Sequence, residues 1–155
     1  GGATVLADAA AMRARIAAAT EAARADDPWE PKQGPGRIKD IELAAETAAL
    51  IAASPLRAPP EQLAAGVAAG WPKPEDATAL GHAWHLLQAL NQALRLVVEP
   101  GGRVEDLGEA GRAVLLRDTG AATLDELRAR LAAARADATH RLDLLLPPQP
   151  ATEQG

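Results

Sequence analysis

The chain has 155 residues, a formal net charge of −5 and a hydrophobic fraction of 48%, with no Cys, Phe or Tyr. The acidic balance argues against nucleic acid as a main partner, because phosphate contacts need clustered Lys and Arg side chains. The lack of Cys excludes a disulfide framework and a thiolate metal site. No apolar stretch approaches the roughly 20 residues that span a bilayer. We therefore expect a soluble cytoplasmic protein, and the start at Gly1-Gly2 without Met predicts part of a longer one.

Amphipathic periodicity in the first half of the chain predicts three helices. The first covers residues 4–25, with an apolar stripe of Val5, Ala9, Met12, Ile16, Ala19 and Ala23. A loop rich in Pro and Gly follows, and a second helix covers residues 36–53. A short helix over residues 59–69 begins at two prolines, which the first turn of a helix tolerates.

The second half predicts three more helices. Residues 74–98 carry the strongest periodic signal, a stripe of Leu80, Trp84, Leu87, Asn91, Leu94 and Val98. Asn91 in this stripe predicts a buried amide bonded to a neighbouring helix. A weaker helix covers residues 104–116, and Thr123 with Glu126 forms a capping box for the last, which ends near Pro147. The fold class is all-α, a bundle of five to six helices over residues 1–146 with a disordered tail at 147–155.

The loop after the first helix holds the candidate binding residues. Gly34 and Gly36 place backbone amides at a helix N-terminus, beside the cations of Lys32, Arg37 and Lys39. Free amides and the helix dipole both favour negative charge, so one interpretation is an anion-binding or nucleotide-proximal loop. The other is a turn that needs glycines, flanked by solvated cations.

Further polar and aromatic residues have two interpretations each. Asp40, Glu42 and Trp29 either contact another domain or serve this one, with Asp40 at the positive end of the helix dipole and Glu42 paired to Lys39. His82 and His85 are three residues apart, a spacing that can chelate zinc. Without Cys or a third His nearby, solvent-facing histidines are the better interpretation.

One motif carries a resemblance to a known family. It reads Lys32-x-x-Pro35-Gly36-Arg37-Ile38-x-Asp40-Ile41-Glu42-Leu43. It resembles the Lys…Gly-Gly-hydrophobic-x-Asp-Ile-Glu-Phe motif of the glutamine-synthetase adenylyltransferases, and Met12-Arg13, residues 63–96 and residues 115–127 resemble other parts of the same helical domain. The departures are Arg37 for the second Gly, Leu43 for Phe and Glu46 for Gln.

The resemblance implies a helical domain that follows a nucleotidyltransferase domain, as related domains do in PII uridylyltransferases. The parent would use ATP and Mg²⁺, modify glutamine synthetase and respond to PII and glutamine. We assign no catalytic or metal-binding residue here, because no Asp-x-Asp pair preceded by Gly-Ser occurs. Asp40 and Glu42 cannot replace one, since helical residues two apart point about 200° away from each other. The resemblance favours the adenylylating half of the enzyme. The alternative is a free-standing helical interaction domain unrelated to nucleotidyl transfer.

Overall fold

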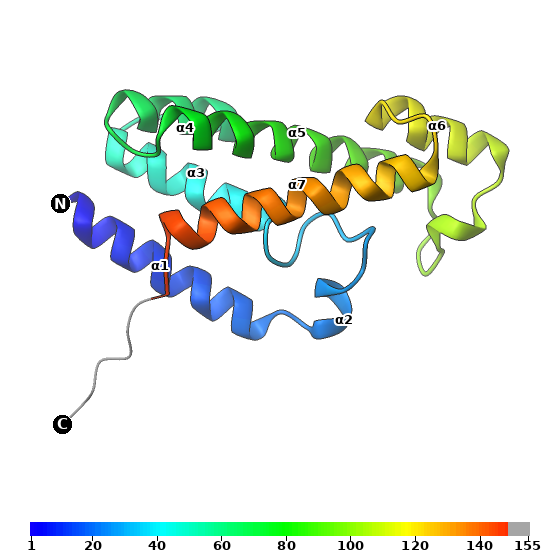
Figure 1. Cartoon of the computed structure of the whole chain (residues 1–155), viewed down its shortest axis with the longest axis horizontal. Helices are drawn as coiled ribbons and strands as arrows, with labels where there is room; N and C mark the ends of the chain where they lie inside the picture. The colour runs from blue at the N-terminus through cyan, green and yellow to red at the C-terminus, as the bar shows by residue number, and fades with distance from the viewer. Residues whose placement is uncertain (149–155) are drawn as a thin grey trace.

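The computed structural model describes residues 1–148, and within them every regular element is a helix (Figure 1). The long helices are α1 Gly2–Ala19, α3 Ile38–Ala52, α4 Pro59–Ala68, α5 Pro74–Val97, α6 Glu109–Thr119 and α7 Leu124–Leu145. The short ones are α2 Ala22–Ala25 and the 3-10 helix η1 Val104–Asp106. The all-α prediction is confirmed. Of the expected tail, residues 149–155 lie outside the described part of the chain.

A core of small and branched aliphatic side chains joins all the long helices. Its fully buried members include Ile41 of α3, Leu63 of α4, Leu87 of α5, Leu115 of α6 and Leu131 of α7. Helix α1 contributes only Ala9 and Ala10. Burying these side chains supplies the main driving force for folding, at about 25 cal/mol per Å² of apolar surface.

The helices pack as a bundle in which α7 runs back beside α5, and α3 and α4 lie against α5 (Figure 1). Helices α3 and α4 approach closely because small residues face each other. A Cβ on Gly66 of α4 would contact Ala48 of α3 and the carbonyl of Trp71. Helix α1 packs on α3, and its middle lies beside the C-terminal end of α7. This arrangement brings α1, α3 and α7 together around the loop at residues 26–37.

The first predicted helix is wrong in its length and in its buried face. Helix α1 ends at Ala19, and Thr20 takes an extended conformation before the single turn of α2. The Thr20 hydroxyl donates to the carbonyl of Ile16, a local bond that competes with continued helix. Met12 and Ile16, predicted to face inward, are each 45% exposed. The apolar residues do recur at helical spacing, but within residues 1–148 no helix covers the part of the stripe that holds Met12 and Ile16.

The second half of the chain needs two smaller corrections. The predicted helix at 104–116 is divided into η1 and α6, because Leu107 and Gly108 adopt extended backbone between them. Asn91 is only partly buried; the fully buried line of α5 runs through Leu80, Leu87 and Leu90 instead. The Thr123 cap is confirmed, since its hydroxyl accepts from the Glu126 amide at 3.0 Å. The Glu126 carboxylate accepts from the amide of Ala122 rather than from that of Thr123.

Candidate functional site

The loop at residues 26–37 is held in place by hydrogen bonds within the chain. The amides at the start of α3 are already paired: Ile38 donates to the carbonyl of Pro31 and Lys39 to that of Lys32, each at 3.0 Å. Glu30 also holds the loop in place, because its carboxylate accepts from the Lys32 amide at 2.9 Å. The loop is therefore a built part of the domain rather than a loose linker.

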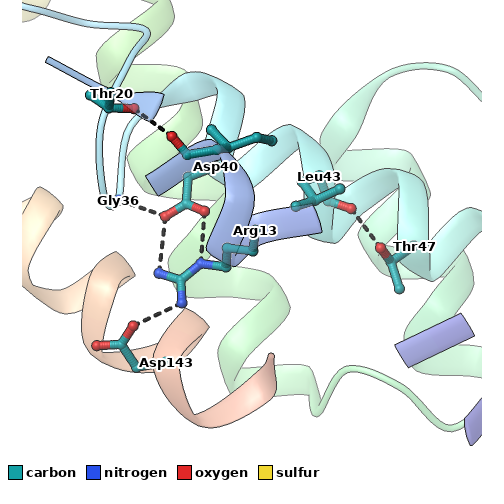
Figure 2. A network of polar contacts seen from close by, with 8 residues as sticks. Arg13, Thr20, Gly36, Asp40, Leu43, Thr47 and Asp143 are labelled. Atoms are coloured by element: carbon teal, nitrogen blue, oxygen red, sulfur yellow. Dashed lines mark hydrogen bonds and ion pairs between the residues drawn. The ribbon is translucent and has the colours of Figure 1, made fainter. Parts of the chain in front are cut away.

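Asp40 of α3 is linked to α1 by Arg13 and, through Arg13, to Asp143 of α7, as Figure 2 shows. Its carboxylate accepts from Arg13 Nε at 2.8 Å and Arg13 Nη2 at 3.1 Å, the two-pronged geometry that makes such pairs strong. It also accepts from the Gly36 amide at 2.8 Å. Arg13 Nη1 reaches on to Asp143 of α7 at 2.8 Å. We call these four residues, Arg13, Gly36, Asp40 and Asp143, the Asp40 cluster.

The Asp40 cluster is sheltered from solvent at its centre. The side chains of Arg13 and Asp40 are 13% and 11% exposed, whereas that of Asp143 is 59% exposed. Burial lowers the pKa of the Arg13 guanidinium, but hydrogen bonds to Asp40 and Asp143 outweigh burial, so its pKa is raised. The guanidinium is therefore charged at neutral pH, and the cluster joins one basic side chain to two acidic ones.

Gly36 allows α7 to approach the loop closely. Its φ of +71° lies in the left-handed region, and a Cβ there would contact the carbonyl of Arg135 and the hydroxyl of Thr139. Only glycine combines that backbone conformation with that little space. Gly36 thus permits close packing of the loop against α7.

Arg37 turns into the domain rather than towards solvent. It is 2% exposed, and Nη2 donates to the carbonyls of Ala25 at 3.0 Å and Asp27 at 2.8 Å. A Cβ on Gly34 would contact the same guanidinium. Burial lowers the pKa of Arg37, and the nearby acids Glu30, Asp27 and Asp26 counteract this. Lys32, by contrast, is exposed, and its role in anion binding stays a prediction.

Trp29 packs into this domain's own core and is 7% exposed. Its Nε1 donates to the Glu105 carboxylate at 3.0 Å, and the Arg128 guanidinium lies 5.5 Å from the ring centroid. The pKa of Glu105 is lowered, first by a hydrogen bond from its own backbone amide and then by the bond from Trp29. Little of the Trp29 surface remains for contact with another domain.

The other candidate residues lie apart from the Asp40 cluster. Glu42 is partly exposed on α3, and it forms no ion pair with Lys39. His82 and His85 are both exposed on α5, as expected, and the His85 ring meets the Trp84 ring edge-on at 5.3 Å. Residues 1–148 contain no group of three or more His, Cys, Asp or Glu side chains placed to hold a metal ion. None of the described helices is long and apolar enough to cross a membrane.

Sequence analysis missed the pairing of Arg13 with Asp40. The two residues are 27 positions apart, and nothing local links them. One signal was present: Met12-Arg13 and Asp40 both belong to segments that resemble the same family.

A cavity of about 570 Å³ adjoins the Asp40 cluster. Alanines of α1, Ile16, Pro35 and Leu146 supply its apolar walls, and the cluster lies along one side. Exposed Met12 lies on the same helix as Ile16. The loop, α1 and the end of α7 therefore form one partly apolar surface on this side of the bundle.

Two comparisons with known proteins indicate the family to which this chain belongs. The sequence model of the family described as GlnD PII-uridylyltransferase matches residues 10–143, which contain the whole Asp40 cluster. The bifunctional glutamine synthetase adenylyltransferase/adenylyl-removing enzyme of Caulobacter vibrioides is 36% identical over 114 residues, or 71% of this chain and 12% of that enzyme. No solved structure matches. The chain therefore belongs to the GlnD PII-uridylyltransferase family.

Proposed function

We propose that this chain is a non-catalytic helical domain that braces a nucleotidyltransferase domain during adenylylation and deadenylylation of glutamine synthetase. The observation that carries the proposal is the 36% identity to an enzyme named for both reactions. ATP and Mg²⁺ would bind to the neighbouring domain. Glutamine synthetase and PII would be partners of the whole enzyme, in the cytoplasm.

The geometry of the motif supports a bracing role. The carboxylate of Asp40 is occupied by Arg13 and the Gly36 amide, so the Asp of the family motif fixes the domain's own loop. A loop held on both sides is a rigid element, and rigid elements position a neighbouring active site better than mobile ones do. The apolar surface of α1 offers a face for the neighbouring domain, since Met12 and Ile16 are each 45% exposed and Ile16 lines the cavity.

A second candidate function is support of uridylyl transfer to PII. It is favoured by the family description, which names PII-uridylyltransferase over residues 10–143. The two candidates share the fold and the bracing role, and they differ in the nucleotide transferred and the protein modified.

A chimeric enzyme tests the proposal. Residues 10–143 of this chain would replace the matching segment of the Caulobacter enzyme. We expect the chimera to transfer AMP from ATP to glutamine synthetase, whereas deletion of the segment abolishes transfer. The isolated chain should transfer none. A chimera as inactive as the deletion, or label transferred by the isolated chain, would contradict the proposal. Transfer of UMP from UTP to PII in place of AMP transfer would favour the second candidate.

The docking face has its own matched controls in the same chimera. Met12→Asp with Ile16→Asp puts charge on the exposed face of α1, and Leu96→Asp does so on α5, where Leu96 is 76% exposed. We expect the α1 change to lower AMP transfer by about tenfold or more, because burying an unpaired charge at an interface is unfavourable. The α5 change should leave transfer within about twofold. Equal effects of the two changes would remove α1 from the docking face.

A further inference from the structure

Two arginines at the back of the loop lack carboxylate partners. Within residues 1–148, neither Arg37 nor Arg135 has a carboxylate oxygen of an Asp or Glu side chain within 4.0 Å. Arg37 is 2% exposed and donates only to main-chain carbonyls, and its Nε is buried without a partner. Arg135 is half-buried and donates Nη1 to the carbonyl of Pro28 at 3.1 Å.

This arrangement is unusual because sheltered charges are normally paired. Carbonyl dipoles satisfy some of the N–H groups, but they do not neutralise a net charge. The two guanidiniums also repel each other. Burial lowers the pKa of Arg135, and the neighbouring charge of Arg37 lowers it further, with Asp27 counteracting both. An anion placed beside the pair would relieve the repulsion and supply the missing counter-charge.

A cavity of about 690 Å³ opens beside both arginines. We call it the arginine cavity; residues of the loop and of α7 line it. Thr139 and His140 of α7 add a hydroxyl and an imidazole to its wall. Two acids also reach it: Asp143, which already pairs with Arg13, and Asp26, which is exposed. Neither is within ion-pair distance of Arg37 or Arg135.

We propose that the arginine cavity binds a phosphate oxyanion through the guanidinium of Arg135 and the hydroxyl of Thr139. Arg37 lies behind them, and its charge adds to the field at the anion. Arg135 suits this role because a guanidinium binds phosphate oxygens with a planar fork. The phosphate comes either from the free anion or from the phosphate chain of a nucleotide. Binding is a property of this chain alone, so it does not depend on the proposed function.

Titration of the full chain with inorganic phosphate, pyrophosphate, ATP and adenosine at constant ionic strength tests the proposal. We expect saturable binding of phosphate and no binding of adenosine. ATP that binds more tightly than pyrophosphate identifies a nucleotide as the source, and equal affinities identify the free anion. No saturable binding of any phosphate compound would overturn the proposal.

Two variants on α7 separate the cavity from general surface charge. Arg135→Gln should weaken phosphate binding by about tenfold or more, since it removes the only part-exposed guanidinium of the pair. Arg130→Gln removes the same charge from an exposed position on the same helix that lines neither cavity, and it should leave binding unchanged. Equal loss in both variants, or no loss in Arg135→Gln, would contradict the proposal.

A measurement on the unaltered chain covers the case in which Arg135→Gln fails to fold. Phosphate should shift the side-chain Nε–H nuclear magnetic resonance signals of Arg37 and Arg135 and leave that of Arg130 in place. Shifts of all arginine signals in proportion to their exposure would show unspecific association and would refute the site.

Discussion

The Asp40 cluster predicts a strong coupling between α1 and α3. Removing one partner of a fully buried ion pair costs about 3–5 kcal/mol, because the other charge is left unpaired. The side chains of Arg13 and Asp40 are 13% and 11% exposed, so the pair is not fully buried. Arg13 also retains Asp143 as a second partner. We therefore expect Asp40→Asn to lower the free energy of unfolding by about 2–3 kcal/mol, at or below the lower end of that range.

A double-mutant cycle isolates the pair from other effects of the substitution. Arg13→Met, Asp40→Asn and the double variant would be unfolded in urea, with helicity followed by circular dichroism. The coupling energy should be about 1.5–3 kcal/mol, because the contact is two-pronged and sheltered. The exposed pair Arg117 and Asp118 is the matched control, and its coupling should be below about 0.5 kcal/mol. A coupling for Arg13 and Asp40 as small as that of the control would refute the structural role of the cluster.

Three further predictions concern the core, the loop and one titrating group. Leu87→Ala should lower the free energy of unfolding by about 2–5 kcal/mol in urea titrations, because Leu87 is fully buried, and a loss under about 0.5 kcal/mol would contradict its burial. Gly36→Ala should destabilise the chain more than Gly101→Ala in thermal unfolding, since both have positive φ, +71° and +79°, but only Gly36 has α7 against its Cβ position; equal losses would contradict the close approach. The lowered pKa of Glu105 means that its contribution is present above its ordinary value of 4.5 and is lost as pH falls through the lower folded pKa. The melting temperature of the unaltered chain should thus fall more steeply below about pH 4.5 than that of Glu105→Gln, and parallel curves would rule out the contribution.

The sequence predicted the helices well where one face is continuously buried. The helix expected at 74–98 agrees closely with α5 Pro74–Val97. A proline in the first turn marks its start, and Pro100-Gly101 follow its end. It predicted α1 less well. Alanine forms helix on any face, so the Ala-rich stretch up to Ala19 gives no sign of which side is buried or where the helix stops. Met12 is 45% exposed although the apolar stripe predicted its burial.

The candidate site was harder to predict because its key contacts are long-range. Arg13 contacts Asp40 and Asp143, at separations of 27 and 130 residues, and neither contact leaves a local pattern. The burial of Arg37 was equally hidden, since Arg is mostly an exposed residue. The position of Arg37 after Gly36 suggested a surface cation. Its side chain is long enough to reach back to the carbonyls of Ala25, the last residue of α2, and of Asp27.

The position of Arg37 separates the two anion hypotheses for this loop, and an experiment can decide between them. The sequence placed its charge at the surface beside Lys32, but the structure buries its guanidinium against Gly34 and the carbonyls of Ala25 and Asp27, where it lines the arginine cavity with Arg135. On the Lys32 side, the Asp40 carboxylate already accepts from the Gly36 amide and so takes the place of an external anion. On the Arg135 side, no internal carboxylate of residues 1–148 does the same. Phosphate binding that is lost in Arg135→Gln and kept in Lys32→Ala would assign the anion to α7, and the reverse result would restore it to the amides of the loop.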